Sequence, residues 1–279
     1  MSTEDSIVHY FPRVRDRDDI AVLKCEKSGV IFLSRCDHMD LEHYHKGSFL
    51  CWDAQDRKTA LLAGLEDDER RFQQFASMIK NKKWMDVGTG AGGILDLLSN
   101  VASKIVAVEP QDIARKSLSA LGYETYSSVE EVQENDFDVV TLFHVFEHFT
   151  DPIRELQSIR RRMAKGAKIV IEVPHAKDFL ISFLENDAFK AFTFWSEHLL
   201  LHTRESLHAF LQAAGFSRIV IQGFQRYPLA NHLHWLSRGK PGGHVAWQQL
   251  RTEELDKAYC NMLAGIDRTD TLIAIAENG

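Results

Sequence analysis

The feature that most constrains the fold is a regular alternation of short apolar runs with longer stretches of helical periodicity. The apolar runs predict strands of four to seven residues, at 84–87, 104–108, 123–126, 137–143 and 168–173. Between them the apolar residues recur at helical spacing, and Asp151-Pro152 is a typical start of one of these helices. Strands that alternate with helices in this way predict a parallel sheet with helices on both faces.

Several elements outside this core follow from the same patterns. A helix is expected from about 67 to 80, and Gly166 is expected to end the helix that begins at Asp151-Pro152. Thr203 should begin another helix, and two more strands are expected at 218–221 and 271–276. We therefore divide the chain into an N-terminal lid or substrate segment at 1–65 and a main domain at 66–279. The main domain contains an insertion at 227–268, with one helix from about 245 to 263.

Composition limits the function. The formal net charge is −7, and no basic stripe marks a nucleic-acid surface. No apolar run approaches the roughly 18 residues of a membrane-spanning helix, and Met1 is not followed by a signal-peptide pattern. Four cysteines at unpaired spacings suit free thiols in the cytoplasm. We therefore expect a cytoplasmic protein that binds neither nucleic acid nor membrane.

A glycine-rich loop follows the first strand of the alternating region and carries Gly88, Gly90 and Gly93. Glycines at this point let the backbone approach a ligand closely, as in dinucleotide-binding proteins. Glu109 ends the next strand, where an acid can bind ribose hydroxyls, and NAD enzymes use the same device. Asp86 helps to distinguish the two kinds of cofactor, because an acid two residues before the first glycine suits a cationic ligand better than a pyrophosphate. The alternative is that Asp86 only stabilises its own loop.

Four blocks in this order resemble class I S-adenosylmethionine (SAM)-dependent methyltransferases. They are the glycine loop at 86–92, the strand at 106–109, the segment at 137–149 with Asp151-Pro152 after it, and the turn at 163–168. The resemblance covers roughly residues 66–225. It implies a Rossmann-like α/β fold with a seven-stranded, mostly parallel sheet whose last strand is antiparallel, and SAM as cofactor.

The resemblance also implies roles for individual residues. The loop glycines and Thr89 would face the methionine part of SAM, with Asp86 near its positive charges, and Glu109 with Pro110 would bind the ribose. Serines follow the third strand where this family often has an aspartate for the adenine. The cofactor residues expected on this basis are Asp86, Gly88, Thr89, Gly90, Gly92, Glu109, Pro110, Ser127, Ser128, Phe143 and His144.

Histidines near the carboxyl ends of the strands are the candidate bases, because a neutral imidazole can take a proton from a hydroxyl. We expect His198, with Glu197 beside it, to be the acceptor-side base. His148 and His144 are the other catalytic candidates, and His148 has the alternative role of bracing SAM. Packing is the alternative for each histidine. Cys36-x-His38 and His43-x-His45 lack the paired spacing of a zinc site, so no metal is expected.

The acceptor is expected to be a small molecule. Segments at 28–33, 195–198 and 231–236 resemble methyltransferases of bacterial surface-polysaccharide pathways, which implies a sugar or nucleotide-sugar acceptor. Quinone and natural-product acceptors stay open, and so does the oligomeric state. An NAD-dependent oxidoreductase and a non-catalytic methyltransferase-fold subunit are the alternatives. A phosphate site and a surface turn are both open for 238–244. The expected acceptor-side residues are Tyr44, His175, Trp195, Arg238, Lys240 and His244.

Overall fold

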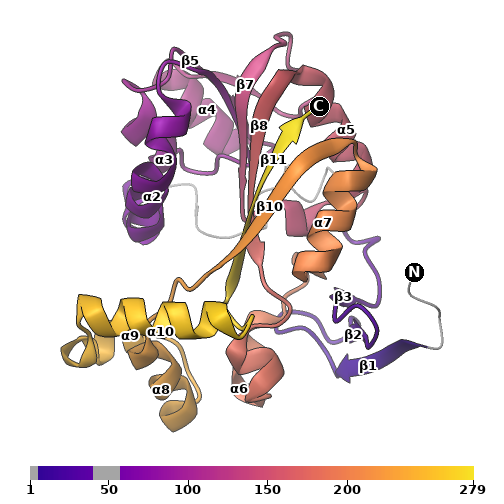
Figure 1. Cartoon of the computed structure of the whole chain (residues 1–279), viewed down its shortest axis with the longest axis vertical. Coiled ribbons are helices and arrows are strands. Elements are labelled where there is room, and N and C mark those ends of the chain that lie inside the picture. Colours follow the sequence, from indigo (N-terminus) through magenta and orange to yellow (C-terminus); the bar gives the residue numbers. More distant parts are fainter. Residues whose placement is uncertain (1–5, 40–56) are drawn as a thin grey trace.

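The chain forms a seven-stranded sheet with a smaller four-stranded sheet beside one of its ends (Figure 1). The computed structural model of the protein describes residues 6–39 and 57–279. The order of the main sheet is β10-β11-β8-β7-β4-β5-β6. Its strands are β4 (Lys83–Val87), β5 (Lys104–Val108), β6 (Glu124–Tyr126), β7 (Phe137–Phe143), β8 (Met163–Pro174), β10 (Phe216–Phe224) and β11 (Thr271–Asn278).

The strand directions confirm the expected fold class. β4, β5, β6, β7 and β8 pair in parallel, whereas β11 is antiparallel to both of its neighbours, β8 and β10. The five expected strands of the alternating region and the two later ones are all present, each within a few residues of its expected bounds.

Helices cover both faces of this sheet, because its strands are apolar on both sides. Leu156 of α5 and Leu207 of α7 pack on one face. Phe75 of α2, Leu95 of α3 and Leu118 of α4 pack on the other. These helices are α2 (Arg57–Ile79), α3 (Gly93–Leu98), α4 (Asp112–Ala120), α5 (Pro152–Arg162) and α7 (Arg204–Ala213).

Two predicted caps are confirmed and one predicted stop is wrong. Asp151 accepts a hydrogen bond from the backbone N–H of Arg154, and Thr203 forms a capping box with Ser206. Helix α5 ends at Arg162, four residues before the expected stop at Gly166. Gly166 lies inside β8 with a φ of 76°, where the register of β8 against β7 shifts.

The N-terminal part contains more sheet than the single strand expected at 30–33. Strands β1 (Ile7–Phe11), β2 (Val22–Cys25) and β3 (Ile31–Leu33) form an antiparallel sheet. Its fourth strand, β9 (Leu200–Leu201), comes from the main domain and pairs with β3. Helix α2 also runs across residue 65, where the sequence places the end of the N-terminal segment.

The insertion after β10 is helical but is not one helix. Thr252 begins a new helix by accepting a hydrogen bond from the Leu255 N–H, so the predicted helix at 245–263 is divided. The elements are α8 (Leu229–Arg238), α9 (Gly243–Ala246), η4 (Gln248–Leu250) and α10 (Glu253–Gly265). The helices of residues 6–39 and 57–279 include none that is long and apolar enough to cross a membrane.

Candidate active site

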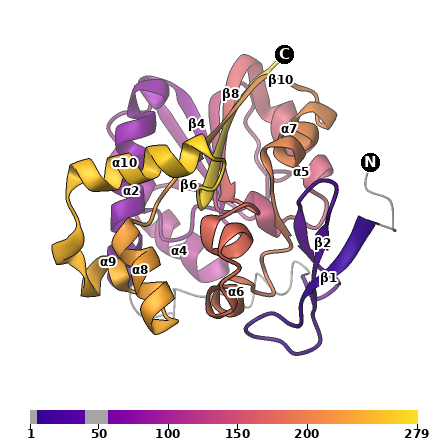
Figure 2. The same ribbon diagram turned by 60° about the horizontal axis from the view of Figure 1, so that its bottom comes forward.

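The candidate site lies at the carboxyl ends of the parallel strands, the edge at which ligands bind in open α/β sheets. Figures 1 and 2 show the four-stranded sheet, α6 (Asp187–Thr193) and the insertion helices at this end of the molecule. The glycine loop that follows β4 also lies at this edge.

The loop glycines serve two purposes. Gly88, Gly90 and Gly92 all have positive φ, between 57° and 77°. A Cβ at Gly88 would lie 2.2 Å from Val145 Cγ2, and one at Gly92 would lie 2.5 Å from Leu118 Cδ2, so packing excludes a side chain at both positions. A Cβ at Gly90 would meet nothing within 4 Å. Gly90 is therefore the glycine of the three that faces open space, where a ligand can approach the backbone.

Glu109 follows β5 and holds the loop from the side. Its carboxylate accepts hydrogen bonds from the backbone N–H of Gly90 (2.7 Å) and from that of Gln111 (2.8 Å). The side chain is 5% exposed, and burial raises its pKa. Each carboxylate oxygen keeps a second lone-pair direction, so the carboxylate can still accept from ribose hydroxyls.

The neighbouring expected contacts lie close to Glu109. Pro110 is partly buried, and its carbonyl accepts from Arg115. The Glu109 N–H donates to the carbonyl of Tyr126, which brings the end of β6 and the following Ser127 and Ser128 alongside.

Asp86 is buried rather than directed at the open side of the loop. Its Oδ1 accepts from the Thr141 hydroxyl (2.5 Å) and its Oδ2 from the Thr89 hydroxyl (3.0 Å). Only 2% of the surface of Asp86 is exposed, and this burial raises its pKa to about 7. The contacts favour the alternative role, in which Asp86 stabilises its own loop. The side chain of Thr89 is likewise engaged with Asp86.

A buried ionic cluster lies beside the loop and was not predicted. Glu172 of β8 is fully buried and receives two hydrogen bonds from Arg70 and one from Arg71, all between 2.8 and 3.0 Å. His144 Nε2 lies 3.2 Å from the same carboxylate. Arg71 also lies over the ring of Phe143, 4.6 Å from its centroid. A carboxylate inside an otherwise apolar strand was the signal in the sequence, because a buried charge requires partners.

Phe143 and His144 thus lie at the junction of α2 and the sheet. Phe143 stacks on Phe75 with centroids 5.7 Å apart. His144 adopts a φ of 57° and directs Nδ1 to Glu147 Oε1 at 3.2 Å. Their ring contacts are with protein, so the structure by itself assigns neither to the cofactor.

Three of the expected catalytic residues, His144, His148 and His198, lie around Glu147. The rings of His148 and His198 are 5.1 Å apart, and ligand atoms of Glu147, His148 and His198 all lie within 4.8 Å of one another. Burial lowers the pKa of His148, and burial together with repulsion from any proton on His148 lowers the pKa of His198 to about 3. Burial alone would raise the pKa of Glu147, but the hydrogen bond with His144 and the nearby rings outweigh it and bring the pKa to about 2. Glu147 is therefore ionised at neutral pH, and the rings of His148 and His198 are neutral.

The turn that carries His198 is held by residues far away in the sequence. The Leu199 N–H donates to the carbonyl of Glu147 (3.0 Å), which fixes the turn against the 3₁₀ turn η2 (Phe146–His148). Ser196 donates from its N–H and its hydroxyl to Asp16, and its carbonyl lies 2.7 Å from His38 Nε2. The contacts of Ser196 with His38 and Asp16 were not predicted, because they join positions more than 150 residues apart.

Two further expected residues occupy this turn. The Trp195 ring lies 5.2 Å from that of His198, with the Arg15 guanidinium 4.4 Å over the indole. Glu197 is 3% exposed, and its carbonyl accepts from the Leu199 N–H.

Comparison with known proteins identifies the family. Residues 58–220 match the methyltransferase domain family. The chain belongs to this family. Its ubiquinone biosynthesis O-methyltransferase relative from Actinobacillus pleuropneumoniae serotype 7 is 26% identical over 144 residues, which is 46% of this chain and 61% of the relative. The chain thus spans about three fifths of the length of the curated relatives that it matches.

Solved structures confirm the methyltransferase fold. A SAM-dependent methyltransferase from Archaeoglobus fulgidus superposes with a TM-score of 0.51 at 18% identity, over 76% of this chain and 93% of that one. The putative methyltransferase in a complex with the Haloferax volcanii Trm112 activator gives a TM-score of 0.52 at 14% identity, over 77% and 92%. The chain therefore has the fold of these methyltransferases.

The methyltransferase loop fits its cofactor. Gly90 leaves open space where a side chain would otherwise project, and the Glu109 carboxylate lies at that glycine's N–H. Glu109 and the backbone at Gly90 are the residues that would hold SAM. The carboxylate of Asp86 is buried between Thr89 and Thr141, which favours the loop-stabilising role over the expected contact with the positive charges of SAM.

The other expected acceptor residues lie apart from the cluster of Glu147, His148 and His198. His175 has no exposed surface, and its Nδ1 lies 2.9 Å from the carbonyl of Thr269, so its ring belongs to the core. Arg238 and Lys240 are exposed on the insertion. The N–H of Gly243 already donates to Asn231, whose side chain also lies 3.4 Å from His244 Nδ1. These contacts favour a surface turn at 238–244, and Tyr44 lies outside the described residues.

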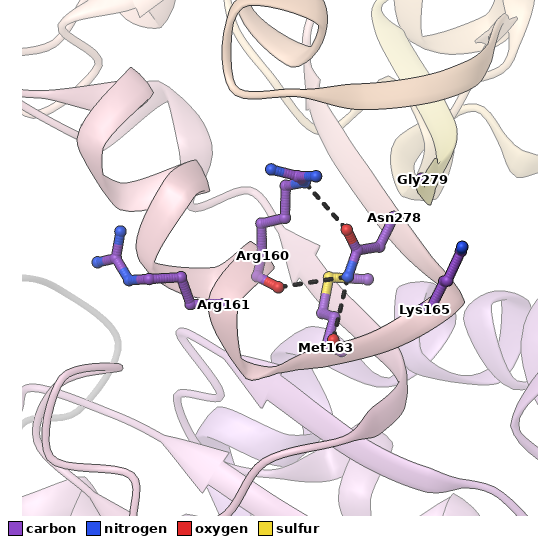
Figure 3. A pocket seen from close by; sticks show the side chains of 6 residues that line it. All are labelled: Arg160, Arg161, Met163, Lys165, Asn278 and Gly279. Carbon is purple, nitrogen blue, oxygen red and sulfur yellow. Dashed lines mark hydrogen bonds between the residues drawn. The ribbon is translucent and has the colours of Figure 1, made fainter.

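A shallow hollow at the opposite end of the sheet is not part of the site. It is lined by basic side chains where β8 begins and β11 ends (Figure 3). Asn278 closes it by donating to the carbonyls of Met163 and Ala164 and accepting from Arg160 (2.9 Å). These bonds join the last strand to the end of α5, so the hollow is a structural junction.

Proposed function

We propose that this protein transfers a methyl group from SAM to a hydroxyl of a small-molecule acceptor bound beside His148 and His198. One observation carries the proposal. Val145, which packs against Gly88 of the cofactor loop, lies in the same short segment as Glu147 and His148. The segment therefore joins the loop to the histidine cluster.

The chain's own residues bind and orient the reactants. When bound, SAM supplies a methyl group already activated by a positive sulfonium. Glu109 and the Gly90 backbone hold the cofactor at one side, and the turn at 195–199 forms the other. Holding two reactants in line contributes about 7–11 kcal/mol to lowering a barrier, so positioning is the main task of this fold.

The acceptor hydroxyl must also lose its proton when it receives the methyl group. His148 and His198 are neutral at pH 7, as a base must be. A ring with a pKa of about 3, such as His198, is nevertheless a weak proton acceptor, because the best catalytic base has a pKa near the working pH. The two rings therefore orient the hydroxyl, and deprotonation needs help from another charge.

We further propose a sugar or nucleotide sugar as the acceptor. The indole of Trp195, beside His198, offers an apolar face for a sugar ring. A phenolic quinone precursor is the second candidate, because the curated relatives are ubiquinone biosynthesis O-methyltransferases.

The test combines binding with turnover. Thermal shift with SAM and with NADH should show stabilisation by SAM, and isotope-labelled methyl-SAM should label a hydroxylated acceptor from a panel of nucleotide sugars and phenols. Stabilisation by NADH but not by SAM would favour an oxidoreductase. SAM binding without transfer to any acceptor would favour a non-catalytic subunit.

A further inference from the structure

The Glu147–His148–His198 cluster contains a buried carboxylate oxygen without a hydrogen-bond partner among the described residues. Glu147 is fully buried, and its Oε1 is engaged by His144 at 3.2 Å. Its Oε2 has no hydrogen-bond partner among residues 6–39 and 57–279. A buried carboxylate oxygen without a partner is costly, more so for a charged group than a neutral one.

The neighbours of this oxygen are also electron-pair donors. One ring nitrogen of His148, one of His198 and a carboxylate oxygen of Glu147 lie within 4.8 Å of one another. A cation between these atoms could accept a lone pair from each of them.

We propose that Glu147, His148 and His198 bind a divalent transition-metal cation. Two imidazoles and one carboxylate form the ligand set of several catalytic zinc and non-haem iron sites, which leave a further coordination position open. Ligand atoms lie about 2.0–2.2 Å from zinc in such sites, so small side-chain rotations would bring all three onto one ion. The sequence predicts no metal, because Cys36-x-His38 and His43-x-His45 lack the spacing of a zinc site. Glu147, His148 and His198 were not considered there as one ligand set.

The surroundings are those of a preorganised site. His144 engages the other oxygen of Glu147, as partners outside the ligand set commonly do for metal-binding carboxylates. The Leu199 N–H donates to the Glu147 carbonyl, and Asp16 holds Ser196, so the segments that carry the ligands are fixed against each other. Turns held in this way lose little entropy when an ion binds.

The cation would also supply the charge that the acceptor proton needs. This role depends on the proposed function, although ion binding does not. An acceptor oxygen at the open position is stabilised in its deprotonated form by the cation, with the proton leaving to solvent.

The binding test uses the full chain without a histidine tag, freed of metal by chelation and dialysis. Titration with Co²⁺ and Zn²⁺ is followed by calorimetry, and by the visible absorption of Co²⁺, which reports coordination number. We expect one equivalent to bind, and Glu147→Gln and His198→Gln each to weaken binding by at least about tenfold. His208→Gln, at an exposed histidine on α7, is the matched control and should bind as the unmodified protein does.

The outcomes separate the two proposals. Absence of stoichiometric binding by the unmodified protein would overturn the metal site, as would binding that neither Glu147→Gln nor His198→Gln weakens. Full methyl transfer by a protein that binds no cation would refute the site and leave the proposed function standing. One bound cation without transfer to any acceptor would support the site and count against the function.

Discussion

The site has a cofactor half, formed by Asp86, the loop glycines and Glu109, and an acceptor half, formed by Glu147, His148 and the turn at 195–199. In the cofactor half the hydrogen bonds join positions no more than 55 apart, as when Glu109 accepts from Gly90 across 19 positions, and both oxygens of Asp86 and of Glu109 accept hydrogen bonds. In the acceptor half the supporting contacts span up to 180 positions, and one carboxylate oxygen has no hydrogen-bond partner among the described residues. The unpartnered oxygen is the difference that the proposed cation would account for.

The largest effect should come from the acceptor half. We expect His198→Ala to lower the rate of methyl transfer by about 10²-fold, because an acceptor that is no longer oriented lies out of line with the methyl group. SAM affinity should stay unchanged. Single-turnover kinetics and calorimetry measure the two quantities, with His208→Ala as control. A near-normal transfer rate would place the acceptor elsewhere.

The next largest effect should be on SAM binding. Glu109→Ala removes a charged acceptor and also releases the N–H of Gly90, so SAM affinity should fall by at least about 1.5 kcal/mol. Glu253→Ala, at an exposed acid on α10, is the control for the change in net charge. Calorimetry that finds equal SAM affinity in Glu109→Ala and the unmodified protein would remove Glu109 from the cofactor half.

Two loop glycines provide a matched pair. Gly88→Ala forces a Cβ against Val145 and should cost about 1 kcal/mol or more of unfolding free energy. Gly90→Ala has room for its methyl group and should cost less stability, but it should weaken SAM binding, because the methyl group fills the open space. Thermal denaturation and SAM titration of both variants test the distinction. The opposite ranking in either measurement would contradict these roles.

The smallest effect on SAM binding should come from Asp86→Asn, because the side chain faces Thr89 and Thr141. Its effect on stability should depend on pH. Burial raises the pKa of Asp86 to about 7 in the folded protein, from about 3.8 unfolded, so the folded state binds more protons and loses stability as pH rises from about 4 to 7. The melting temperature of Asp86→Asn, relative to that of the unmodified protein, should therefore increase as pH rises over this range. A constant difference would mean that Asp86 is already ionised there.

The same contrast explains what could be predicted from the sequence. The strands, the glycine loop and Glu109 were predictable because each depends on neighbours within one strand–helix unit. The five parallel strands follow from repeating that unit, whereas the antiparallel last strand was expected from the family resemblance. The arginines that bind Glu172, and the contact of Asp16 with Ser196, were not predictable, because they depend on which distant segments meet. His148 and His198 were singled out individually, but their proximity to Glu147 required the structure.

The short strand β9, which joins the N-terminal sheet to the main domain, has a consequence for folding. Contacts between residues close in the sequence form quickly. Contacts between distant segments form more slowly, because closing a long loop costs conformational entropy. The cofactor half can therefore form while residues 6–39 are still unfolded. The acceptor half is completed only when these residues return to pair β3 with β9 and to place Asp16 on Ser196. Denaturant that releases the N-terminal sheet should thus abolish turnover before it abolishes cofactor binding.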